Sequence, residues 1–77
     1  MSDEKMALTI TNSKDSELLL RLEPWGDEHS VASGVTCRID AQGPRDGVLE
    51  IEVGESVLTV FGWTGCTVEI YKVPAPK

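Results

Sequence analysis

One short stretch of the chain combines the residue types that acid–base catalysis uses. In EPWGDEHSV (residues 23–31), the only histidine of the chain directly follows two carboxylates. A histidine titrates near neutral pH and a neighbouring carboxylate can fix its tautomer, so an acid–base pair can be drawn between His29 and Asp27, Glu28 or Glu23. However, no nucleophile motif, glycine-rich phosphate loop or second histidine accompanies it. We therefore expect the run to be solvated turn surface, and the protein not to be an enzyme.

Metal binding is the second chemistry to consider, because small β-domains often hold a metal ion. A blue-copper site needs two imidazoles and a thiolate, and jelly-roll metal sites use several histidines, so a single histidine excludes both. A zinc site remains arithmetically open with the ligands His29, Cys37, Cys66 and either Asp27 or Glu28. Because the two cysteines stand far apart without C-x-x-C spacing, we expect no metal and no cofactor.

The two cysteines, Cys37 and Cys66, share the parity of apolar neighbours on their segments, so both are predicted to point inward. A disulfide across the core is conceivable if their strands face each other, but it requires α-carbons within about 7 Å, which spacing alone does not show. In a reducing cytoplasm, two buried free thiols are the expected state.

The charge pattern excludes one large class of partners. Thirteen acidic and seven basic residues give a net charge of −6, and the basic residues are scattered singly. Nucleic-acid binders gather Lys and Arg on one face to neutralise phosphates, so no nucleic-acid partner is expected. The start, MSDEKMALTI, lacks the charge pattern and apolar region of a secretory signal, and no apolar run approaches the roughly 18 residues of a membrane span. We expect a cytoplasmic protein without a membrane partner.

Apolar residues alternate with polar ones along most of the chain, which predicts an all-β fold. The expected strands are separated by turns rich in Gly, Asn and Pro, and they cover residues 6–11, 17–23, 29–32, 35–41, 48–53, 56–61 and 66–73. Seven short strands at such intervals are typical of a sandwich or barrel. We predict one domain over residues 1–77, an antiparallel β-sandwich or partly open barrel with Greek-key connections, with flexible tails at 1–5 and 74–77.

The parity of each strand separates a core side from an outer side. The predicted core consists of Leu8, Ile10, Leu18, Leu20, Leu22, Cys37, Ile39, Leu49, Ile51, Val53, Leu58, Val60, Val68 and Ile70. The outer parity also carries apolar residues, namely Leu19, Val48, Val57, Phe61, Tyr71 and Val73. A contiguous patch of these would indicate a subunit interface, which suits a domain whose core is small. Alternatively, they are dispersed singly or covered by the N-terminal segment.

The aromatic residues suggest where a ligand would bind. Trp25 stands between Pro24 and Gly26, and Trp63 follows Gly62, so both indoles are expected in turns. In one hypothesis they form an exposed platform with Tyr71 that stacks on sugars or anchors a protein. In the other they fold back and plug an open end of the sandwich. The candidate interaction surface is Trp25, Phe61, Trp63 and Tyr71.

The segments LTITN (8–12), LLLRLEP (18–24) and GVTCRID (34–40) resemble the early strands of immunoglobulin-like and cupredoxin-like sandwich domains. The resemblance implies architecture alone, because the copper ligands are missing and the only tryptophan between the cysteines stands just before the second. We therefore expect a non-catalytic interaction or structural module that self-associates or binds another protein. The alternative is a carbohydrate-binding module that uses Trp25, Trp63 and Tyr71.

Overall fold

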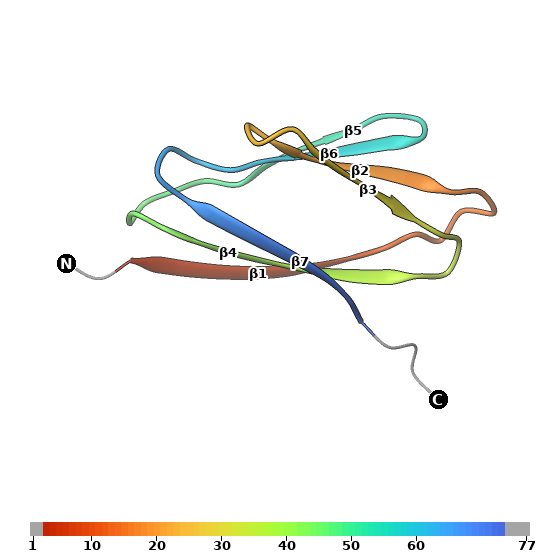
Figure 1. Cartoon of the computed structure of the whole chain (residues 1–77), viewed down its shortest axis with the longest axis horizontal. Helices are drawn as coiled ribbons and strands as arrows, with labels where there is room; N and C mark the ends of the chain where they lie inside the picture. Colours follow the sequence, from red (N-terminus) through yellow and green to blue (C-terminus); the bar gives the residue numbers. More distant parts are fainter. Residues whose placement is uncertain (1–2, 74–77) are drawn as a thin grey trace.

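The computed structural model describes residues 3–73 and confirms the all-β sandwich. Its strands are β1 (Glu4–Thr11), β2 (Leu18–Glu23), β3 (Asp27–Val31), β4 (Thr36–Gly43), β5 (Glu50–Val53), β6 (Val57–Phe61) and β7 (Thr67–Val73), and no helix occurs among the described residues. They form two layers, a three-stranded sheet of order β1-β4-β7 and a four-stranded sheet of order β3-β2-β6-β5 (Figure 1). Every predicted strand is present, with boundaries within two residues of those expected.

The four-stranded sheet is mixed rather than purely antiparallel. β2 runs parallel to β6, whereas the other pairings in the described part of the chain are antiparallel. The chain leaves this sheet after β3, forms β4 in the other layer and returns through β5, so β6 arrives beside β2 in the same direction. Parallel neighbours need such a crossover, whereas antiparallel neighbours can be joined by a tight hairpin.

Two predicted boundaries differ from the structure because strand pairing extends further than the sequence pattern. Glu4 and Lys5, expected in the N-terminal tail, pair with Gly43 and Gln42 as the first residues of β1. The D-E-H run, expected as turn surface, forms the first part of β3. The turn lies just before it, where the Gly26 N–H donates to the Leu22 carbonyl. The tail predicted at 74–77 lies outside the described residues.

The core lies between the two layers and is built mainly from aliphatic side chains. Leu20, Val31, Ile39 and Val60 are fully buried. Twelve of the fourteen predicted core residues are buried or pack against this cluster as partly buried side chains. The alternation of hydropathy along each strand therefore identifies the inward side correctly, as expected for strands with one wet face.

The two exceptions, Ile51 and Val53, both belong to β5. They stand opposite the core residues Val60 and Leu58 of β6, so they lie on the inward side of the sheet, yet they are 46% and 76% exposed. β5 is an edge strand of the wider sheet, and the β5–β6 hairpin lies at the top of its layer, away from β1, β4 and β7 (Figure 1). Because twist accumulates toward a sheet's edge, the narrower sheet leaves this corner uncovered.

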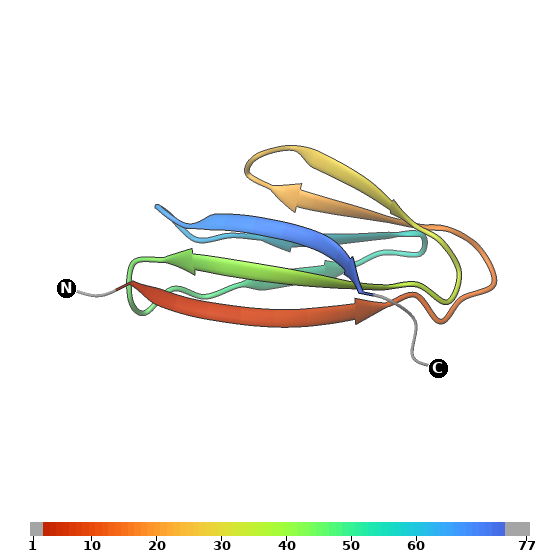
Figure 2. The same ribbon diagram turned by 60° about the horizontal axis from the view of Figure 1, so that its bottom comes forward.

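The connections gather at the two ends of the sandwich. The β2–β3 turn, the β4–β5 loop and the β6–β7 turn lie at one end, and the remaining three connections lie at the other (Figure 2). The first end carries both tryptophans and is called the tryptophan end below. At the second end, the buried Asn12 amide donates to the carbonyls of Ser16 and Val31, which ties the β1–β2 loop to β3.

Candidate functional site

The structure separates the groups that the sequence offered for acid–base or metal chemistry. His29 lies half-buried on the inward side of β3, directly opposite Leu20. Glu28 points to the other side and forms an exposed ion pair with Arg21, at 3.0 Å between Nη2 and Oε2. Within residues 3–73, no three His, Cys, Asp or Glu side chains come together as metal ligands. The candidate zinc set is thus not assembled in this part of the chain.

The two thiols are buried and free, at opposite ends of the molecule. Cys37 is the second residue of β4 and stands opposite Ile10. Cys66 packs against the backbone of Gly43, the last residue of β4. Six residues of extended strand separate these two positions, or about 20 Å at the usual rise per residue. A disulfide between them is therefore excluded in this fold.

Trp63 closes the tryptophan end by packing on the β4–β5 loop. Its indole lies directly over Gly47, where a β-carbon would overlap the ring. The ring N–H donates to the carbonyl of Pro44 at 2.8 Å, so the polar atom of this half-buried side chain has a partner. The glycine is therefore needed for the contact, in which Trp63 folds back onto the β4–β5 loop.

Trp25 lies at the same end but remains 41% exposed. A β-carbon on Gly62 would stand 2.5 Å from both the Trp25 ring edge and the Cys66 sulfur. The absence of this atom allows the indole and the thiol to approach each other across the glycine, in the kind of sulfur–aromatic contact that stabilises cores modestly. Trp25 thus packs with one part of its ring and presents the rest to solvent.

The proposed aromatic platform is not assembled. Phe61 is half-buried on the outer face of the four-stranded sheet, beside Glu23 and Glu50 in register. Tyr71 lies on β7 in the other sheet, opposite Arg38 and away from the tryptophan end. The surplus apolar residues of the outer parity are divided in the same way, because β6 and β7 belong to different sheets. They form no single patch.

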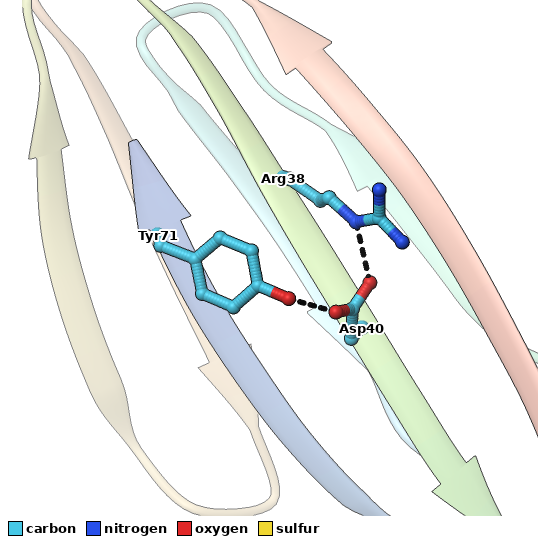
Figure 3. Close-up of polar contacts among 3 residues, drawn as sticks. All are labelled: Arg38, Asp40 and Tyr71. Carbon is cyan, nitrogen blue, oxygen red and sulfur yellow. Dashed lines mark hydrogen bonds and ion pairs between the residues drawn. The ribbon is translucent and has the colours of Figure 1, made fainter. Parts of the chain in front are cut away.

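Tyr71, Asp40 and Arg38 form a small polar network on the outer face of the three-stranded sheet (Figure 3). The Tyr71 hydroxyl donates to Asp40 Oδ2, and Arg38 Nε donates to Asp40 Oδ1 at 2.7 Å. Arg38 and Asp40 of this network also line a shallow hollow of about 540 Å³, which Tyr71 itself does not line; the other polar residues of the hollow are Lys5, Gln42, Thr67 and Glu69. Sequence reasoning missed this cluster, although the i, i+2 spacing of Arg38 and Asp40 places opposite charges on one strand face.

The inward side of β5 is the clearest uncovered apolar surface of the described residues. We call Ile51 and Val53 the β5 strip; Val48, in the loop two residues before the strand, is also mostly exposed. The alternating residues of the strand, Glu50 and Glu52, are exposed on the outer side. Every residue of β5 is therefore accessible, on both faces of the sheet.

No protein-family model, curated protein or solved structure matches this chain. Over the described range, 3–73, no helix is long and apolar enough to cross a membrane. What the domain does must therefore be inferred from its own surfaces, of which the β5 strip, the tryptophan end and the hollow beside Tyr71 are the candidates.

Proposed function

We propose that this domain is a non-catalytic protein-interaction module that binds its partner through the β5 strip. The observation that carries the proposal is the exposure of Ile51 and Val53 on the core-facing side of an edge strand that is paired only with β6. Soluble proteins usually blunt such edges, because exposed apolar residues beside free backbone groups promote association. Burial of a Val or Ile side chain contributes about 1.5 to 3 kcal/mol, so covering both would be a substantial part of a binding energy.

Charge repulsion favours a different protein, and not a second copy of this chain, as the partner. The sequence led us to expect self-association, but each copy carries a net charge of −6 and two glutamates on β5 itself. Like charges that stand opposite each other across a strand pair are destabilising. We therefore expect a monomer at low ionic strength, with any self-association strengthened by salt, as measured by light scattering after size-exclusion chromatography.

Selection of binding peptides tests the proposed function. Peptides that bind the wild type are selected from a library of random ten-residue peptides. The selected peptides are then tested for binding to Ile51→Thr/Val53→Thr and to Val48→Thr, a control outside the strand. Threonine keeps the β-branched shape but removes apolar surface. We expect the selected peptides to bind the wild type and the control but not the double variant. Equal retention by all three proteins would refute binding through the β5 strip.

A carbohydrate-binding module is the second candidate, favoured by the hollow beside Tyr71. The ring of Tyr71 is exposed and tethered through its hydroxyl, and the hollow offers several hydrogen-bonding side chains. Aromatic rings with nearby polar groups suit sugar rings, which have apolar faces and hydroxyl rims. We expect this function to give glycan-induced amide shifts around Tyr71 that disappear in Tyr71→Ala but persist in Trp25→Ala. A broad glycan panel without such shifts would exclude it.

A cytoplasmic location is part of the proposal. Its support is the pair of buried free thiols, since secreted domains of this size commonly use their cysteines in disulfides. Buried thiols should react with a thiol reagent only after unfolding. The expected result is that both cysteines are recovered from cells in the reduced form, label slowly in the native protein and label fully in denaturant. Recovery of either cysteine from cells in a disulfide would contradict the location.

A further inference from the structure

We propose that β5 is a strand-addition site, and that its occupant is an extended segment of another protein in which apolar residues alternate with Lys or Arg. This inference rests on the proposed function and adds the mode of binding and the chemistry of the partner. It is carried by the direction of the backbone groups of β5, by the side chains on its two faces, and by the charge of the chain.

The backbone of β5 presents free hydrogen-bonding groups at its open edge. The Gly54 N–H donates to the Val57 carbonyl at 2.7 Å, so this pair closes the β5–β6 hairpin as a hydrogen-bonded pair. Hydrogen-bonded and non-hydrogen-bonded pairs alternate along an antiparallel ladder. Glu52 therefore bonds to β6, whereas Ile51 and Val53 occupy non-hydrogen-bonded pairs and direct their N–H and C=O groups away from β6.

The residues with free backbone groups are thus the residues of the apolar strip. An incoming strand that hydrogen-bonds to Ile51 and Val53 would place one set of its side chains beside them, on the core-facing side of the sheet. Apolar side chains at these positions would cover the strip and extend the core sideways. Binding by main-chain bonds with pockets for alternate side chains is an established mode of peptide recognition.

The other set of incoming side chains would lie beside Glu50 and Glu52 on the outer face. Both glutamates are exposed, and the nearest outer-face residues in register on β6 are Phe61 and Thr59, which carry no compensating charge. Opposite-charge cross-strand pairs are favourable and like-charge pairs are not. The partner strand is therefore expected to carry Lys or Arg at alternate positions.

The same geometry disfavours a second copy of this chain as the occupant. In a symmetric antiparallel pairing with Ile51 opposite its own equivalent, Glu50 of each copy would stand opposite Glu52 of the other. Such a dimer would bury the apolar strip but align four carboxylates on one face, on chains that are already acidic. A basic alternating segment keeps the apolar contact and removes the repulsion.

β5 is also the edge best suited to this role. The other edge strands of the described chain are β1, β3 and β7, and of their residues only Tyr71 is a large exposed hydrophobic side chain. That tyrosine is engaged with Asp40 on the outer face. Among the strands of residues 3–73, β5 alone combines an open edge with exposed aliphatic side chains on the core-facing side.

The charge requirement is tested with two fluorescent nine-residue peptides that alternate valine with lysine or with glutamate. At low salt, we expect the wild type to bind the lysine peptide at least about tenfold more tightly, and Glu50→Lys/Glu52→Lys to reverse the preference. The control is Asp27→Lys/Glu28→Lys, which makes the same change in net charge on β3, the opposite edge of the sheet. We expect it to retain the preference for the lysine peptide, and an equal reversal in the control would overturn the site.

The backbone requirement is tested with Val53→Pro, which removes an N–H that faces the open edge and leaves the ladder with β6 intact. Circular dichroism and amide spectra confirm that the variant folds, and Val53→Thr serves as the variant that retains the N–H. We expect Val53→Pro to weaken the lysine peptide at least about tenfold more than Val53→Thr does. Undiminished binding by Val53→Pro would overturn strand addition.

The outcomes also separate this inference from the proposed function. If library-selected peptides depend on the β5 strip but show neither the charge preference nor sensitivity to Val53→Pro, the interaction module stands and strand addition by a basic segment is wrong. If selected peptides bind independently of Ile51 and Val53, both fail.

Discussion

Two strands of the same sheet, β2 and β5, share one sequence pattern and have opposite environments. In β2 the inward residues Leu18, Leu20 and Leu22 are buried, with Leu20 fully inaccessible. In β5 all four residues are exposed, including the two on the inward side. β2 lies between β3 and β6, whereas β5 is bonded on one side only. Coverage by the opposite sheet therefore decides burial, because β3 is also an edge strand and still buries Val31, whereas β5 lies at an uncovered corner. Alternation only identifies which side faces inward.

The two strands therefore contribute differently: β2 stabilises the fold, and β5 leaves apolar surface exposed. The leucines of β2 belong to the buried cluster that must offset the ordering entropy of a short chain. The apolar residues of β5 gain little from folding, since most of their surface stays in water. Their apolar surface remains available to a partner, which is the physical basis of the proposed function.

The largest expected effect comes from a matched pair of substitutions on neighbouring strands. Val60 and Val53 both lie on the inward side of the β5–β6 hairpin, but Val60 is fully buried and Val53 is mostly exposed. We expect Val60→Ala to lower the free energy of unfolding by about 2 to 3 kcal/mol, and Val53→Ala by less than about 0.5 kcal/mol. Urea denaturation measures both. Equal losses would mean that β5 is as well covered as β6.

A smaller effect is expected at the loop that leads into β5. Because the indole of Trp63 lies directly over Gly47, a methyl group there must displace the ring and break its hydrogen bond to Pro44. We expect Gly47→Ala to cost about 1 to 3 kcal/mol and to increase the solvent exposure of tryptophan fluorescence. Gly54→Ala is a useful comparison with a smaller expected cost, since a β-carbon there would stand 3.1 Å from the Val57 carbonyl oxygen, a tight contact but not an overlap with a ring. A harmless Gly47→Ala would refute the packing of the tryptophan end.

The smallest effect on stability is expected for the charges of β5. Glu50 and Glu52 are exposed, and surface substitutions away from packing features usually change stability by less than about 0.5 kcal/mol. We expect Glu50→Lys/Glu52→Lys to unfold at the same urea concentration as the wild type while its peptide preference reverses. A marked loss of stability would show that these charges serve folding, contrary to the division between β2 and β5.

Much of the fold could be predicted from the sequence because alternation and turn residues are local signals. They located seven strands and twelve of the fourteen core positions. The distribution of strands between the two sheets depends on long-range pairing, which no local pattern reports. For that reason the exposure of Ile51 and Val53, the parallel β2–β6 pair and the separation of Tyr71 from the tryptophans emerged only from the structure.

One local signal at β5 could have been used. The strand is short and carries glutamate at alternate positions, features typical of edge strands, where they disfavour pairing with a second acidic copy but not with a basic segment. A strand of this kind is expected at an edge, where its apolar residues have fewer neighbours to cover them. Local sequence also indicates that both tryptophans lie in turns and that Arg38 and Asp40 share one strand face. Which other residues lie next to them depends on the strand order, which the sequence pattern does not report.

Amide hydrogen exchange of the monomer, followed residue by residue by NMR, tests the open edge of β5 most directly. The hydrogen-bond alternation predicts fast exchange at Ile51 and Val53, whose N–H groups face solvent, and slower exchange at Glu52, whose N–H is bonded to β6. Addition of the lysine peptide should slow exchange at Ile51 and Val53. Strong protection of both amides in the free monomer would show that the edge is already covered, and would contradict the account.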